Sequence, residues 1–202
     1  PCINASGRLD TAARSLRLLQ CEDAGEAARL AGDLKALNDS RKALTEKGKD
    51  AAIQLIENTD LKNDPVLVVY LPECHESLAG IIAGRIREKY NRPVFVLTKG
   101  EKGVKGSGRS IQQYSMFEEL VKCGDLLDQY GGHPMAAGLS LPEENVSLLR
   151  KRLNEQCNLK EEDLIPKVMI DVPMPISYIS AKLVEQLSLL EPFGKGNTEN
   201  YH

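Results

Sequence analysis

YGGHPMAAGLSL, residues 130–141, is the stretch from which the fold of this chain is most readily inferred. Gly131 and Gly132 allow the backbone to adopt positive φ or to approach another group closely. His133 follows at once, and its imidazole can donate, accept or carry a charge near neutral pH, which suits a phosphate group. Residues 139–141 alternate as a strand does. The stretch predicts a tight turn into a strand, with His133 either facing a ligand or buried in the core.

The eight residues GGHPMAAG resemble the GGHxxAAG signature of the DHH-associated domain. In the DHH superfamily of phosphoesterases this domain is the substrate-binding half. The resemblance implies an α/β fold and a phosphate-containing substrate, and it places His133 in the binding site.

Composition limits the classes of protein that fit. The chain has 202 residues, 42% of them apolar, which is enough for a sizeable core. The net charge of -3 argues against a protein that coats nucleic acid with its whole surface, although a local basic groove remains possible. No apolar run is long enough to span a membrane, and no membrane partner is expected.

Cysteine usage predicts a reducing compartment. The five cysteines are odd in number and scattered, without a CxxC pair, so neither a disulfide framework nor a zinc knuckle is indicated. We therefore expect a cytoplasmic protein. Because the chain begins with Pro1, we also expect it to be a piece of a longer protein.

Residues 1–10, PCINASGRLD, predict a turn-rich start in which Asp10 caps the following helix. INASGRLD also resembles the NAxGRLD segment that follows the catalytic domain in RecJ-type single-strand exonucleases. This resemblance implies that Asn4 and Arg8 lie near the nuclease cleft and bind substrate. Residues 11–58 are helical in character, with leucines and isoleucines at spacings of three and four and a break at 23–25.

A strand, a helix and a second strand are predicted at residues 66–71, 77–90 and 94–98. Both strands are unbroken apolar runs, and such a crossover unit makes them parallel. His75 precedes the helix, where it can cap the helix or meet a ligand. The segment at 74–98 resembles the WHxGVIGIVAxR…RPVxVL block of the RecJ family, with Cys74 for Trp and Ser77 for Gly.

Residues 99–110, KGEKGVKGSGRS, are rich in glycine and cations. They predict either a phosphate cradle or a flexible hairpin whose lysines only aid solubility. GSGRS resembles the GSxRS motif of the RecJ family, which implies substrate contacts for Ser107, Arg109 and Ser110. A planar guanidinium such as that of Arg109 can grip two phosphate oxygens at once.

A capping box at Ser115 and Glu118 predicts a helix that ends near Gly124, and Pro142 predicts the start of another. Beyond residue 163 we expect a strand through 168–172 and an amphipathic helix at 179–190. EPFGKGNTEN resembles the PFGxGNPxP signature at the start of the OB-like domain of RecJ, with Thr198 for Pro.

The expected architecture is therefore α/β with three parts. Residues 1–60 form a helical linker from a missing DHH catalytic domain, residues 61–160 a DHH-associated domain with a mixed, partly parallel sheet, and residues 161–202 a truncated start of an OB-like domain.

These motif blocks, which occur in family order, imply the carboxy-terminal half of a RecJ-type exonuclease. In that family the enzyme degrades single-stranded DNA from the 5′ end in repair and recombination, with Mn or Mg held by the DHH domain. By resemblance, Arg109 and His133 act on the phosphate, and Gly131, Gly132, Ser107, Ser110, His75, Asn4 and Arg8 bind substrate. The chain has only three histidines and no clustered metal motif, so we expect it to bind no metal and to be inactive alone.

Two alternative functions remain. A DHH phosphodiesterase for short oligoribonucleotides or cyclic dinucleotides shares GGHxxAAG, but the long linker helix and the PFGKGN segment argue against it. A non-catalytic nucleic-acid-binding module, such as the related tRNA-contacting domain of alanyl-tRNA synthetases, would not need Arg109 and His133 together. Binding to 5′-phosphorylated single strands of several lengths, and to tRNA, separates the three.

Overall fold

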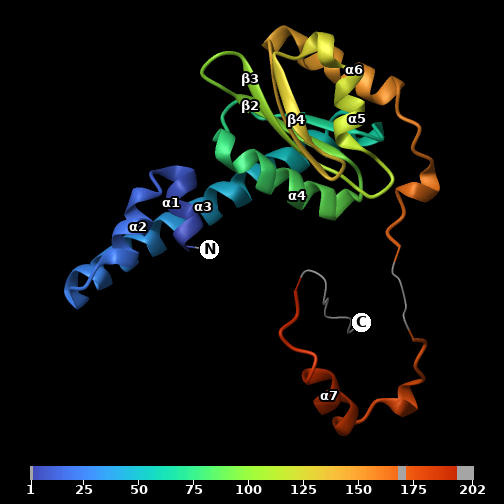
Figure 1. The fold of residues 1–202 in the computed structure, drawn as a ribbon. Helices are drawn as coiled ribbons and strands as arrows, with labels where there is room; N and C mark the ends of the chain where they lie inside the picture. The colour runs from blue at the N-terminus through green and yellow to red at the C-terminus, as the bar shows by residue number, and fades with distance from the viewer. Residues whose placement is uncertain (1, 168–171, 195–202) are drawn as a thin grey trace. The chain divides into compact units, whose positions relative to one another are not determined.

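The structure is a computed structural model that describes residues 2–167 and 172–194. The chain divides into two compact units, Pro1–Pro166 and Lys167–His202. The first unit contains a helical segment and a five-stranded sheet (Figure 1). The fold is thus α/β, with a long helix and a mixed sheet, as the sequence predicts.

The helical segment consists of α1 (Cys2–Leu9), α2 (Ala13–Gln20) and α3 (Ala24–Glu57). The predicted break before the long helix is confirmed, because Asp23 is the N-cap of α3 and accepts a hydrogen bond from the Glu26 amide at 2.6 Å. α1 packs along α3.

Two predictions for the first ten residues are wrong. The segment is a helix, α1, and Asp10 pairs with Arg14 at 2.6 Å instead of capping α2. The hydroxyls of Ser6 and Ser15 lie 2.8 Å apart and join α1 to α2. Packing of the small residues of α1 against α3 thus outweighs the weak helix propensity of a segment rich in Asn, Ser and Gly.

The sheet has the strand order β1-β2-β3-β5-β4. β1 and β2 are parallel, as predicted, and are connected through α4; the other pairs are antiparallel. The strands are β1 (Leu67–Tyr70), β2 (Val94–Lys99), β3 (Val104–Arg109), β4 (Gln129–His133) and β5 (Ala136–Leu141).

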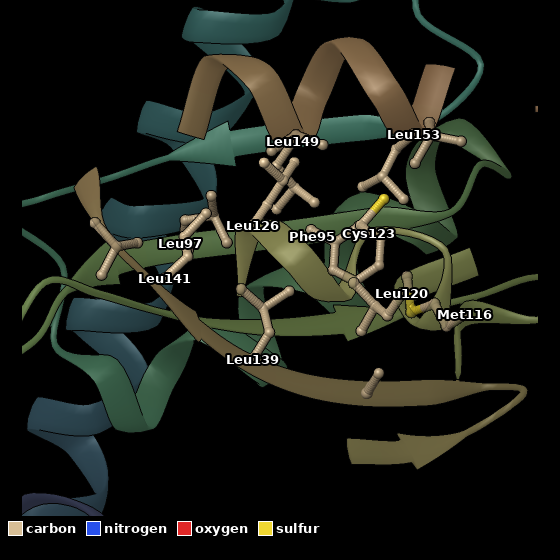
Figure 2. Packing of buried hydrophobic residues seen from close by; sticks show 14 of the residues in the cluster. Phe95, Leu97, Met116, Leu120, Cys123, Leu126, Leu139, Leu141, Leu149 and Leu153 are labelled. Carbon is tan, nitrogen blue, oxygen red and sulfur yellow. The ribbon is translucent and has the colours of Figure 1, made fainter. Parts of the chain in front are cut away.

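Helices cover the sheet unequally. α4 (Ala79–Tyr90) and the end of α3 pack on one face of β1 and β2, while α5 (Met116–Val121) and α6 (Val146–Glu155) pack on the other face (Figure 1). Figure 2 shows Leu149 and Leu153 pointing from α6 toward the sheet. Strands β5 and β4 therefore have a core on the α5–α6 side and lie beyond α4 on the other side.

The predicted helices at 115–124 and after Pro142 are confirmed, although the first lacks its expected cap. Ser115 is the N-cap residue of α5, but its side chain makes no capping hydrogen bond, so the capping box with Glu118 does not form. The short 3-10 helices of the first unit are η1 (Asp60–Asn63), η2 (Glu76–Leu78), η3 (Gly124–Leu126), η4 (Glu143–Asn145) and η5 (Glu161–Asp163).

The second unit contains η6 (Ile176–Tyr178) and α7 (Ala181–Ser188), which confirms the helix predicted near 179–190. The strand predicted through 168–172 lies mostly outside the described residues, as does most of EPFGKGNTEN. In the described ranges, no helix has the length and apolar character required to cross a membrane.

Candidate functional site

Strand register brings Arg109 and His133 to the same face of the sheet. Arg109 of β3 pairs with Ala136 of β5, and Ala136 pairs with His133 of β4. Partners in antiparallel strands project from the same face, and two strand spacings separate the outer pair by about 10 Å. The two further rows on this face are Ser107–Gly138–Gly131 and Lys105–Ser140–Gln129.

Neighbouring side chains identify this face as the α4 side. A Cβ at Gly80 of α4 would lie 2.8 Å from Nη2 of Arg109 and 2.9 Å from Oγ of Ser107. At Gly108, between these two residues on β3, a Cβ would instead meet Met116 at 2.5 Å in the core. Glycine at position 80 thus allows Arg109 to lie against the start of α4.

A hollow of about 590 Å³ lies over the rows Ser107–Gly138–Gly131 and Lys105–Ser140–Gln129. Its lining includes Glu76, Ser77 and Lys105 on one side and Gln129 and Gly131 on the other. A Cβ at Gly131 would have no atom within 4 Å, so this glycine leaves the floor of the hollow open. Arg109 and His133 form the next row, two residues along the strands, and border the hollow.

Arg109 is half-buried and has the properties of an anion-binding group. Its Nη1 donates to the Gly108 carbonyl at 2.7 Å and to Ser107 Oγ at 3.2 Å. Burial, and then the nearby charge of Arg8, lower the pKa of its guanidinium, which still carries its charge at neutral pH. No carboxylate among the described residues forms an ion pair with it. Its charge is therefore available to a ligand.

His133 is exposed at the end of β4, so the alternative of a buried core histidine is wrong. Its Nδ1 accepts a hydrogen bond from the Met135 amide at 3.3 Å. A neutral imidazole that accepts at Nδ1 carries its proton on Nε2. Nε2–H is thus the donor that His133 can offer to a phosphate oxygen.

Arg8 approaches the site from α1. Its Nη1 donates to the Ser77 carbonyl at 2.9 Å, beside the hollow. Asn4, by contrast, lines a different depression, which also includes Arg8, on the surface of α1 and α2. The two residues that the sequence grouped thus share one face of α1, and Arg8 is the one whose charge acts on Arg109.

The remaining predicted residues lie elsewhere. His75 caps η2, because its Nδ1 accepts from the Ser77 amide at 3.3 Å, and it lines a separate apolar cavity with Cys74. Ser110 is buried, its hydroxyl donates to the Tyr114 carbonyl at 2.6 Å, and its side chain does not line the hollow. Gly132 pairs with Ala137, which pairs with Gly108, and this row lies on the face of the sheet that packs on the core. Gly132 is thus on the face opposite to the hollow.

Sequence reasoning missed polar residues of the hollow such as Gln129 and Glu76, and it favoured a solubilising role for Lys105. The alternation of Lys105, Ser107 and Arg109 was a usable signal, because residues two apart in a strand share a face. Residues 99–110 are a hairpin in which residues 104–109 form β3, and not a phosphate cradle made by a loop. Glu76 carries no such signal, because it approaches from η2.

The side chains that could ligate a metal ion are scattered over the fold. Within residues 2–167 and 172–194, no group of three or more His, Cys, Asp or Glu side chains is placed to hold a metal ion. The donor set of these residues therefore does not fit a two-metal centre.

The fold and the open face define a domain class. Residues 63–159 match the DHHA1 domain family, so the sheet and its helices are a DHHA1 domain. Over 201 residues the chain is 38% identical to the single-stranded-DNA-specific exonuclease RecJ of Bacillus subtilis, covering 98% of this chain and 25% of that protein. The chain belongs to the RecJ family.

Solved structures agree with this assignment. The crystal structure of RecJ from Thermus thermophilus in complex with Mg²⁺ matches with a TM-score of 0.87 and 34% identity. The match covers 98% of this chain and 31% of that one. The Mn²⁺ complex of the same protein matches equally well, covering 29% of its chain. The chain thus spans about a quarter to a third of the length of these relatives.

Proposed function

We propose that this chain is the substrate-binding part of a RecJ-type exonuclease that digests single-stranded DNA from the 5′ end. The observation that carries the proposal is the shared row of Arg109 and His133 beside an open, glycine-floored hollow. The similarity to RecJ exonucleases along almost the whole chain supports it. The parent protein would act in cytoplasmic DNA repair and recombination.

In this proposal, the row of Arg109 and His133 holds the 5′ phosphate or the phosphate that is cut. The guanidinium of Arg109 presents paired N–H donors that match two phosphate oxygens, and Nε2–H of His133 adds a donor from the other side. Because Arg109 is half-buried and already fixed by the Gly108 carbonyl, little side-chain entropy is lost on binding. Both groups stabilise negative charge that develops on the oxygens.

The metals of the reaction are proposed to lie in a DHH domain outside this chain. The relatives of known structure were solved with Mg²⁺ or Mn²⁺, and such ions activate water for phosphodiester hydrolysis. This chain would supply substrate contacts alone. We expect no Mn²⁺-dependent nuclease activity from it, and activity that disappears in His133→Ala would contradict this division of labour.

Replacing Arg109 tests the proposal directly. We expect Arg109→Ala to weaken binding of a 5′-phosphorylated oligothymidylate by about 10- to 100-fold, since it removes a charge-assisted, two-pronged contact. Arg109→Lys should recover only part of the affinity because lysine lacks the planar fork. Fluorescence anisotropy at low salt measures both. The plot of log affinity against log salt should become shallower by about one unit.

The matched control is Arg152→Ala, which removes the same charge from α6 on the other side of the sheet. It should bind like the unmodified chain. Equal loss in both variants would show that Arg109 acts only through net charge and would reject the site. Stronger binding to tRNA than to single strands would support the non-catalytic module instead. Affinity that does not rise beyond two or three nucleotides would support a short-oligonucleotide phosphodiesterase.

A further inference from the structure

An ion pair between Lys105 and Glu76 lies along one side of the hollow, at the end away from Arg109. Nζ of Lys105, on β3, lies 2.8 Å from Oε2 of Glu76, on η2, and both side chains line the hollow. Both are about half exposed, with side-chain exposures of 49% and 44%. The pair is therefore accessible to any ligand that enters the hollow.

Lys105 is placed to continue a phosphate-binding track that begins at Arg109. The two residues project from the same face of β3, four residues apart, which separates their Cα atoms by about 13 Å. Successive phosphates of a stacked strand are about 3.4 Å apart along its axis and farther apart in an extended strand. A strand anchored at Arg109 thus reaches Lys105 at most about four nucleotides later.

The charges at the two ends of the hollow differ. Among the described residues, Arg109 has no carboxylate partner, whereas Lys105 is neutralised by Glu76. A carboxylate in this position also repels an incoming phosphate. Exposed ion pairs contribute little free energy, so a phosphate can take the place of Glu76 on Lys105.

We propose that Lys105 is a second phosphate contact and that Glu76 restrains it, so that Glu76 limits how firmly the hollow holds nucleotides beyond the first two. This inference rests on the proposed function, since it assumes that the first phosphate is bound at Arg109 and His133. Glu76 is thus a specificity-determining residue for the length of strand engaged.

The test compares 5′-phosphorylated oligothymidylates of two and eight nucleotides, bound to the 202-residue chain at low salt. Glu76→Gln is expected to bind the eight-nucleotide strand about 3- to 10-fold more tightly, because one nearby repulsive charge is removed and Lys105 is freed. Its affinity for the two-nucleotide strand should be unchanged. Adding Lys105→Met to Glu76→Gln should abolish the gain.

The matched control is Glu155→Gln, which removes a carboxylate that pairs with Lys151 on α6, on the other side of the sheet. It should change neither affinity. The inference is overturned if Glu76→Gln binds the long strand no better, if it improves both strands equally, or if Lys105→Met leaves the gain intact. Arg109→Ala separates failure of this inference from failure of the proposed function. If the proposed function is wrong, Arg109→Ala will bind the two-nucleotide strand as tightly as the unmodified chain does.

Discussion

Phe95→Ala is expected to lower the free energy of unfolding of the first unit by about 3–5 kcal/mol. Among the residues that the structure describes, Phe95 is the largest fully buried side chain, and it lies in the core between the sheet and α5 and α6 with Leu120, Cys123 and Leu153 (Figure 2). The neighbouring strand gives it little space to spare, since a Cβ on Gly108 would lie 2.8 Å from its ring. Truncation therefore leaves a cavity that tightly packed neighbours cannot fill.

Urea denaturation followed by far-ultraviolet circular dichroism measures this loss. Phe95→Leu is the matched control, because it keeps most of the apolar volume and should cost about 1–1.5 kcal/mol. The slope of free energy against urea should stay the same in both variants if only the native state is affected. A loss below about 1 kcal/mol for Phe95→Ala would contradict the packing described above.

Gly132→Ala is expected to destabilise the first unit by about 2–4 kcal/mol. Gly132 has φ of 150°, a conformation that residues with a side chain rarely adopt. An added Cβ would also lie 2.4 Å from the Ala136 carbonyl oxygen and 2.6 Å from Cα of Ala137. The β4–β5 hairpin must then shift, and His133, the next residue, shifts with it.

Gly131→Ala, one residue earlier, is the matched control. Its added methyl group would meet no atom within 4 Å, so stability should change by less than about 0.5 kcal/mol. The methyl group would instead enter the hollow, where oligonucleotide binding should weaken while the fold remains. Urea titration of both variants, with anisotropy measured on each, checks the contrast. Equal destabilisation by Gly131→Ala and Gly132→Ala would contradict the prediction that only position 132 requires glycine.

Much of the fold follows from local patterns in the sequence. The apolar runs at 66–71 and 94–98 with a helix between them predicted a parallel crossover, and β1, α4 and β2 form one. The glycines before His133 predicted a tight turn at that point, but Gly131 and Gly132 lie within β4, and the chain turns after His133, at Pro134 and Met135. The crossover prediction succeeded because apolar runs and helical spacing depend on a few neighbouring residues.

Predictions that depended on distant neighbours were less accurate. The first ten residues form α1 because α3 offers a surface on which small residues pack, which no local pattern reveals. Ser110 belongs to the same GSGRS motif as Arg109, yet it turns into the core where β3 ends and bonds to Tyr114. The motif identified both residues but not the directions of their side chains. These directions depend on where β3 ends, which is at Arg109.

The sequence by itself determined the α/β class and the crossover unit, and it identified Arg109 and His133 as candidate site residues. Only the tertiary structure decided that these two side chains share a face. That outcome depends on the register of β3, β5 and β4, in which a shift by one residue would turn one side chain to the opposite face. It also decided that Glu76 meets Lys105, because η2 and β3 come together only when α4 packs on the sheet.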